Sequence, residues 1–185
     1  MNTSSGDYFH NLLDRYRANF DITENYTLGQ NTYPAYAQFF SLGEKYVLKK
    51  EAKLWAIRAY EHVLFIETAD VLSETLKEIQ RTIEEEMEPE LVRKGEKYPE
   101  EDHMCSYLTF VIISEKTPEK EIQKAIRRFS YDKGYLFGLR GHSQARIACA
   151  CLDSERVFTN YAGKELKKLL TNTFNTLKGR EEKAS

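Results

Sequence analysis

Four residues of this sequence, His103, Cys105, Cys149 and Cys151, are of the types that bind zinc. Each pair is spaced two residues apart, so on a β-strand both members would point to the same face. If the two strands were neighbours, the four side chains could converge on one metal ion. The simpler interpretation treats Cys149 and Cys151 as small buried hydrophobic residues, because free cysteine is among the most buried residue types.

A second group, Glu44, Glu51 and Lys53, could hold Mg²⁺ and activate water. The expected order over residues 1–115 is a helix, three strands, a helix and a strand. This order resembles the core of the restriction-endonuclease superfamily, which places an acidic residue near the second strand and a Glu-x-Lys on the third. The usual Pro-Asp is missing here and Glu51 lies in an expected turn. A charged hairpin tip is therefore the alternative interpretation.

Two further groups of polar residues could form a ligand-binding site. Arg58 and His62 would share one face of a strand, with Glu61 and Glu67 on the other. Because the strand is otherwise apolar, these polar side chains could form a buried ion pair or line a cleft. Arg140, His142 and Arg146 surround Gly141, and a glycine turn flanked by arginine can hold an anion. In both cases a solvated strip of polar residues is the simpler alternative.

The first half of the sequence predicts one helix followed by three strands, and these elements would position Glu44, Arg58 and His62. Asp7 can cap a helix whose apolar residues recur as far as Phe20, and 21–33 is expected to be a loop. Ala35–Phe40 is strand-like, 41–44 is expected to form a turn, and 45–50 a return strand. After a second turn, Leu54–Glu67 completes a three-strand antiparallel meander. Ala35–Phe40 is then the expected sheet edge.

The second half alternates helices and strands. A helix capped by Thr68 or Asp70 runs to Pro89, His103–Ser114 is a strand, and Thr117-Pro118 starts another helix. A tight turn at 140–143 should join strands 134–140 and 143–153, the second of which is apolar on both faces and so expected to be central. A short strand, Arg156–Thr159, precedes a last helix capped by Asn160 and ended by Gly179. The order α-βββ-α-β-α-ββ(β)-α predicts an α+β fold with a twisted mixed sheet.

Length and composition restrict the class of protein. A chain of 185 residues with 41% hydrophobic and 30% charged residues predicts one globular domain, over 7–179, between disordered tails at 1–6 and 180–185. The net charge of −2 gives no global support for nucleic-acid binding. No apolar run is long enough to span a membrane and the N-terminus lacks a signal-peptide pattern. Three cysteines fit the cytoplasm.

Two long stretches carry a resemblance. They are 44–67, EKYVLKKEAKLWAIRAYEHVLFIE, and 135–170, YLFGLRGHSQARIACACLDSERVFTNYAGKELKKLL. Together they resemble a family of uncharacterised proteins from low-GC Gram-positive bacteria. The resemblance implies a cytoplasmic bacterial protein and brings no activity with it.

Three hypotheses for function follow. The first is a non-enzymatic binding or assembly module that forms a homodimer, because sheets with open edges are often covered by self-association. The second is a Mg²⁺-dependent nuclease or phosphodiesterase that uses Glu44, Glu51 and Lys53. The third is a zinc protein. Only the second and third require a cofactor.

Overall fold

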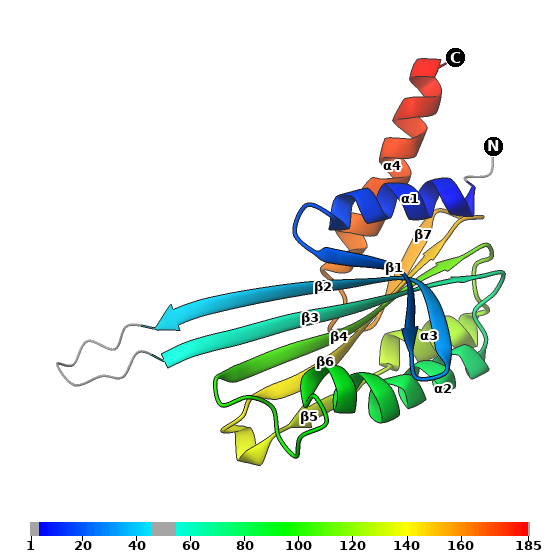
Figure 1. The fold of residues 1–185 in the computed structure, drawn as a ribbon. Helices are drawn as coiled ribbons and strands as arrows, with labels where there is room; N and C mark the ends of the chain where they lie inside the picture. Colours follow the sequence, from blue (N-terminus) through cyan, green and yellow to red (C-terminus); the bar gives the residue numbers. More distant parts are fainter. Residues whose placement is uncertain (1–3, 46–54, 185) are drawn as a thin grey trace.

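A seven-stranded mixed sheet organises the chain (Figure 1). The computed structural model describes residues 4–45 and 55–184. The strand order is β1-β2-β3-β4-β6-β5, and β7 also pairs with β6. The neighbours β3, β4 and β6 run parallel, whereas the pairs β1–β2, β2–β3, β5–β6 and β6–β7 are antiparallel. The expected single α+β domain is confirmed.

The bounds of the elements follow the chain in order. They are α1 Ser5–Tyr16, β1 Asp21–Leu28, β2 Asn31–Lys45, β3 Trp55–Thr68, α2 Ser73–Thr82, the π-helix η1 Ile83–Val92, β4 His103–Ser114, α3 Lys120–Arg128, β5 Asp132–Gly134, the 3-10 turn η2 Leu136–Gly138, β6 His142–Cys151, β7 Arg156–Thr159 and α4 Leu166–Ala184.

The N-terminal meander exists, but its strands differ from the expected ones. The segment 21–33, expected to be a loop, forms β1 and the start of β2, joined by a turn in which Gly29 has φ +58°. The expected turn at 41–44 lies inside β2, and most of the expected return strand lies outside the described residues. Two asparagines and one glycine favour a loop locally. Pairing with β2 decides otherwise, because it satisfies the backbone of the whole segment.

The expected sheet edge was also wrong. β1 pairs with β2 from Asn31 to Gln38, so most of Ala35–Phe40 is an inner strand. Beyond Gln38, β2 continues to Lys45 with β3 as its partner. The open edge of β2 is therefore its C-terminal half.

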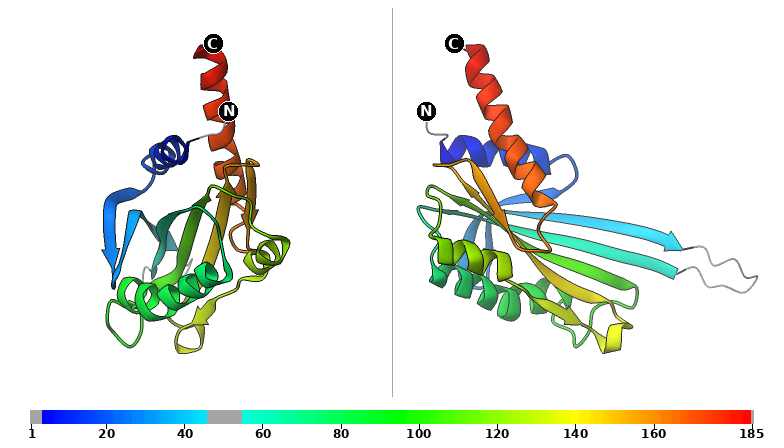
Figure 2. Two further views of the ribbon diagram at one scale, coloured as in Figure 1. Left: turned by 90° about the vertical axis from the view of Figure 1, so that its right-hand side faces the viewer. Right: turned by 180° about the vertical axis from the view of Figure 1, so that it is seen from behind.

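Helices cover both faces of the sheet (Figure 2). On one face α1 and α4 pack on β2, β3, β4 and β6 through residues that include Leu12, Phe65 and Phe174. On the other, α2, η1 and α3 pack on the same strands through residues that include Ile79, Phe110 and Ile126. The parallel neighbours are buried on both sides, as crossover connections require.

Strand β6 has the buried, two-faced character expected of 143–153. Ile147 and Cys149 lie in one core cluster, and Ala148 and Ala150 in the other. The expected tight turn at 140–143 is wrong, because β5 ends at Gly134 and η2 intervenes before β6. Gly141 has φ +72°, and a Cβ there would lie 2.2 Å from the Met104 carbonyl oxygen. The close approach of β4, which local turn signals do not encode, shapes this connection.

Candidate functional site

The feature that sets this molecule apart from a simple covered sheet is an arm in which β2 and β3 continue beyond the end of β1. We define the arm as Phe39–Lys45 of β2 and their partners Trp55–Glu61 of β3. Its outer part, Gly43–Lys45 with Trp55–Ile57, projects beyond β4, whose pairing with β3 begins at Arg58 (Figures 1 and 2). Within the described residues, Phe39–Lys45 have a strand partner only on the β3 side, because β1 pairs no further than Gln38. The arm thus presents a row of backbone groups on its outer edge.

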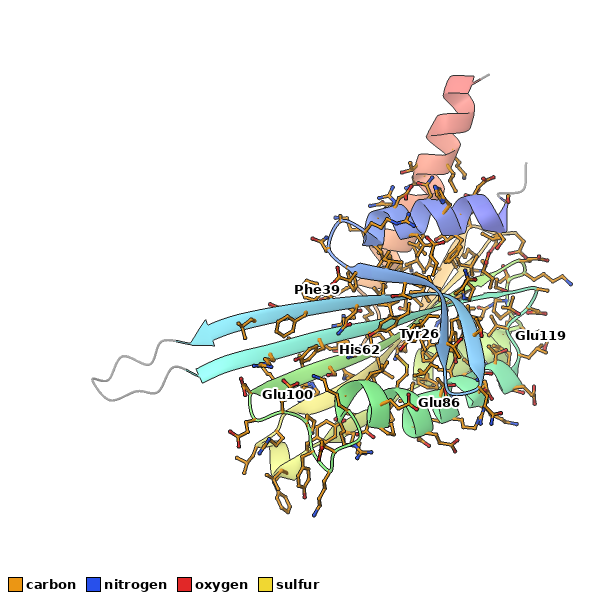
Figure 3. All side chains as sticks on the ribbon, viewed as in Figure 1. Tyr26, Phe39, His62, Glu86, Glu100 and Glu119 are labelled. Atoms are coloured by element: carbon orange, nitrogen blue, oxygen red, sulfur yellow. The ribbon has the colours of Figure 1, made fainter. Side chains whose placement is uncertain are left out.

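Two large apolar side chains on this strand reach solvent. Phe40 is 48% exposed and Leu42 is 54% exposed. They are two residues apart, so they lie on the same face of the strand. The Phe40 ring contacts that of Tyr60, with centroids 5.0 Å apart, and on the opposite face Phe39 packs on Phe20 at 5.5 Å. Figure 3 labels Phe39 on the arm.

Ion pairs and a hydrogen bond connect the base of the arm, Arg58 and Tyr60, to the loop before β4. Arg58 Nη1 donates to Glu100 at 2.6 Å, and its Nε lies 3.2 Å from Asp102 Oδ2. Tyr60 donates its hydroxyl to Glu100 at 3.4 Å, and Lys94 also pairs with that carboxylate. The hydrogen bond from Lys94, with help from Arg58, lowers the pKa of Glu100. Its carboxylate therefore stays charged and holds β3 to the loop.

The ion pairs lie in a hollow of about 660 Å³, which we call the cleft. Its charged lining combines residues of β3, η1's C-terminal loop and the segment before β6: Arg58, Arg93, Lys94, Glu96, Lys97, Glu100, Glu101, Asp102 and Arg140. Arg140 donates to the Pro99 carbonyl at 3.0 Å and lies 3.4 Å from Glu101. Two predicted ligand-binding residues, Arg58 and Arg140, thus come together here, eighty-odd residues apart in sequence.

A layer of parallel rings lies next to the cleft. His62 is only 2% exposed, and its ring is nearly parallel to those of Tyr36 and Tyr60, each with its centroid 6.1 Å away. His62 Nδ1 shares a hydrogen bond of 2.7 Å with Tyr36 Oη. Burial, reinforced by Lys94 and His103, lowers the pKa of His62 to about 4. The side chain is therefore neutral at pH 7 (Figure 3).

His103 connects this layer to Arg140. Its Nδ1 hydrogen-bonds the Arg140 carbonyl and its Nε2 the Ser106 hydroxyl, both at 2.8 Å. A register shift next to Arg58 interrupts the strand alternation at the start of β4. As a result His103 packs against Tyr60 and Tyr135, whereas Cys105 lies beside Tyr107 and Arg146. The expectation that His103 and Cys105 share one face was wrong for this reason.

The four potential zinc ligands do not come together. Cys149 and Cys151 lie in the core under α2 and α3, with Sγ atoms 3.9 Å apart. Cys149 is opposite Ile112, towards the end of β4, while His103 begins that strand. Over the described parts of the chain, no group of three or more His, Cys, Asp or Glu side chains has the arrangement to hold a metal.

The expected cluster of Arg140, His142 and Arg146 is divided between two places. Arg146 lies with Glu61, 3.5 Å from its carboxylate, and its guanidinium stacks 3.4 Å from the centroid of Tyr107. Thr109 donates a hydrogen bond of 2.8 Å to Glu61. His142 is half-buried and pairs with Cys105 across β4 and β6. Arg146 therefore belongs to a structural ion pair.

The proposed nuclease residues are only partly described. Glu44 is in the β2 part of the arm, opposite Ala56 of β3. Glu51 and Lys53 lie outside the described residues. Whether Glu44, Glu51 and Lys53 lie close together therefore stays a prediction.

Sequence reasoning missed Phe40, Leu42 and Glu100. The run AQFFSL, residues 37–42, did contain a signal. On a strand, Phe40 and Leu42 share one face, and they form an exposed apolar patch if no other element covers that face. Nothing in the sequence pointed to Glu100, because its partner Arg58 is remote and the loop that carries it has no motif.

One protein-family model matches the chain, over residues 4–172, and it describes a domain of unknown function (DUF8052). Searches of curated proteins and of solved structures found no match. Among the described helices, none has the length and apolar character needed to cross a membrane. The expected membership of an uncharacterised family is confirmed.

Proposed function

We propose that this chain, which belongs to the DUF8052 family, is a non-enzymatic binding and assembly module of the bacterial cytoplasm that forms a homodimer through its arm. One observation carries the proposal. The Phe39–Lys45 strand has an open outer edge within the described residues and two exposed apolar side chains on one face. An edge of this kind is a template for another strand.

A second copy of the chain is the partner that best fits this edge. A two-fold axis perpendicular to the sheet would pair the two β2 edges antiparallel and make one continuous sheet. If Ser41 faces its own copy, Phe40 of one protomer stands opposite Leu42 of the other. Both apolar side chains would then be covered by cross-strand contacts on the same face.

The base of the arm supports the same proposal. Arg58 and Tyr60 fix β3 to Glu100, so the arm is held in an extended shape before any partner binds. A preformed strand loses less conformational entropy on association than one that must first order. The three cysteines are free and buried, which is compatible with the cytoplasm.

Sedimentation velocity over a concentration series tests the proposal. We expect the wild-type chain to be dimeric at micromolar concentrations and a Phe40→Lys/Leu42→Lys variant to be monomeric, with the dimer dissociation constant raised at least ~100-fold by two buried charges on each side of the axis. Phe137→Lys/Leu139→Lys is the matched control, because these two exposed apolar residues lie outside the arm. A monomeric wild type, or an equal effect of the control, would contradict the proposal.

Cross-linking tests the register. We expect Ser41→Cys to form an intermolecular disulfide under mild oxidation, because antiparallel strand partners have the Cβ separation that a disulfide needs. Ser130→Cys, also exposed, is the control and should stay unlinked. If the Phe40→Lys/Leu42→Lys variant is monomeric but Ser41→Cys never cross-links, the arm is the dimer interface and the proposed register is wrong.

A nuclease remains a second candidate because the order α1-β1-β2-β3-α2-β4 agrees with the expected core. This hypothesis predicts Mg²⁺- or Mn²⁺-dependent cleavage of nucleic acid that Glu51→Ala abolishes. Wild-type protein that cleaves neither DNA nor RNA with either metal would reject it. The zinc hypothesis gains no support from the positions of its four ligands.

A further inference from the structure

A second open edge, at the opposite side of the sheet, lies in a basic hollow. This hollow of about 800 Å³ follows β7 and is lined on one side by Arg127 of α3 and on the other by Lys167 and Thr171 of α4. We call it the β7 groove. Figure 1 shows β7 between these two helices. The β7 groove is thus lined by one strand and by residues of two helices.

Within the groove, the open backbone is that of β7. This strand pairs with Ala148–Cys151 of β6, and no other described strand pairs with it. Next to it, the Asn160 side chain occupies the β6 edge as a strand would: its Oδ1 accepts from the Ile147 amide at 2.9 Å, and its Nδ2 donates to the Ala145 carbonyl at 3.0 Å. Asn160 does not cap α4, which begins at Leu166; its Oδ1 also accepts from the Gly163 amide at 2.9 Å. β7 is left as the segment with outward-facing amides and carbonyls.

The charge of the groove is almost entirely positive. Its lining contains the cations Arg127, Arg156, Lys164 and Lys167 and a single acid, Glu155. Glu155 pairs with Lys178, and none of the ion pairs among the described residues includes any of the four cations. The groove therefore keeps its charge for a ligand.

Aromatic rings orient the cations without neutralising them. The guanidinium carbons of Arg127 and Arg156 lie 6.0 and 5.0 Å from the centroid of Phe158, and Lys164 Nζ lies 4.1 Å from that of Tyr161. Contacts of this type restrict a long side chain while its charge remains available. Tyr161 is itself 78% exposed.

We propose that the β7 groove binds an acidic, extended peptide segment of a partner protein, which adds to β7 as an extra strand. The strand edge supplies backbone hydrogen bonds. Successive side chains of the added strand alternate between the two faces, so a segment with an acid at every second position presents its carboxylates on one face, where Lys164 and Lys167 can receive them. This site is separate from the arm and does not depend on self-association.

A peptide fits the groove better than a nucleic acid does. Single-stranded nucleic acid would use the cations and the exposed Tyr161 ring, but it cannot pair in a regular ladder with the backbone of β7. Basic residues on an edge can also serve only to prevent strand pairing. Both alternatives give results that the experiment distinguishes.

The test uses fluorescence anisotropy with the full chain and a fluorescein-labelled peptide of alternating glutamate and valine. We expect saturable binding at low salt, weakened at least ~10-fold in Lys164→Glu/Lys167→Glu. The control Lys77→Glu/Lys97→Glu makes the same change of net charge with exposed lysines outside the groove and should bind as the wild type does. Thermal unfolding of each variant verifies its fold.

Two N-methylated versions of the same peptide test strand addition, each methylated at one of the two alternating sets of amides. Only one set can face β7, so one version should bind and the other should lose binding. Equal binding of both versions would overturn the proposal in favour of simple charge attraction. Absence of peptide binding would also overturn it, as would tighter binding of a thymidine 15-mer that Lys164→Glu/Lys167→Glu abolishes.

Discussion

The cleft and the β7 groove have similar numbers of cations but differ in the acids that accompany them, four in the cleft and one in the groove. Five cations line the cleft and four line the groove. In the cleft, Arg58, Lys94 and Arg140 each contact an acid of the same hollow, and Arg93 pairs with Glu88 behind it. In the groove the only acid of the lining pairs with a lysine outside it. One set of charges holds the fold together, and the other remains available.

This contrast shows why a count of basic residues does not identify a binding site. A cation that already has a carboxylate partner must lose it before it can hold a ligand, and the exchange gains little free energy. The residues Arg58 and Arg140 were predicted as ligand-binding because of their types. In the structure both already have carboxylate partners in the cleft, Glu100 for Arg58 and Glu101 for Arg140.

The largest expected effect comes from removing Glu88, which holds one wall of the cleft. Glu88 is 1% exposed and accepts from Arg93 at 2.7 Å and from the Tyr135 hydroxyl at 2.9 Å, with Lys133 at 3.0 Å. Burial raises its pKa, but these partners outweigh burial and lower it overall. We expect Glu88→Ala to reduce the free energy of unfolding by about 3–5 kcal/mol, because it removes the charge-assisted hydrogen bonds from Arg93 and Tyr135 and leaves the partly buried Arg93 without a carboxylate partner.

Urea denaturation measures this effect, and Glu85→Ala is the control from the same π-helix. Glu85 is exposed and lies 3.7 Å from Arg81. Its removal should change the free energy of unfolding by less than about 0.5 kcal/mol. Equal effects of the two substitutions would show that the ion pairs behind the cleft do not stabilise the fold.

The second prediction concerns the ring layer next to the cleft and the pH. His62 has a pKa lowered from 6.5 to about 4 in the folded state, so the unfolded chain binds more protons between these values. Stability therefore falls as the pH is lowered from about 6.5 to 4, by roughly 3 kcal/mol from this residue alone. In His62→Phe this part of the acid destabilisation should disappear.

Urea midpoints at pH 7 and pH 4 for both proteins give the difference. His142→Phe serves as the control, because His142 is half-buried and lies outside the ring layer. If the wild type and His62→Phe lose the same stability on acidification, His62 does not titrate as its burial implies.

The third prediction compares one acid from each hollow. Glu100 accepts from Arg58, Lys94 and Tyr60, whereas Glu155 contacts Lys178 at the border of the groove. Glu100→Gln should lower the free energy of unfolding by about 1 kcal/mol, and Glu155→Gln by less than about 0.5 kcal/mol. Chemical denaturation of the two variants measures both values. A larger loss for Glu155→Gln would reverse the contrast between the hollows.

The smallest expected effect comes from making the lining of the cleft more positive, as in the groove. Glu100→Gln/Glu101→Gln removes two of the four acids that line the cleft. Affinity for the acidic peptide should rise by no more than about twofold, because the cleft offers charge without an open strand edge. Anisotropy titration measures the change. A gain as large as the loss in Lys164→Glu/Lys167→Glu would mean that charge alone directs binding.

Elements with dense local patterns were predictable from the sequence. His103–Ser114 and Arg156–Thr159 are strands with the expected bounds, because continuous or alternating apolar residues are flanked by turn residues. Residues whose structure depends on remote partners were not. Asp21–Leu28 became a strand through pairing with β2, and Asn160 bridges β6 instead of capping α4, which begins at Leu166.

The sequence by itself determined the α+β class, the apolar faces of the helices, a buried β6 and the presence of Arg58 and His62 on one strand face. Strand order, the register shift beside Arg58 and the pairing of each cation were decided by the tertiary structure. The physical reason is the range of the interactions. Burial patterns repeat within a strand or a helix turn, whereas an ion pair or an open edge exists only after distant segments have met.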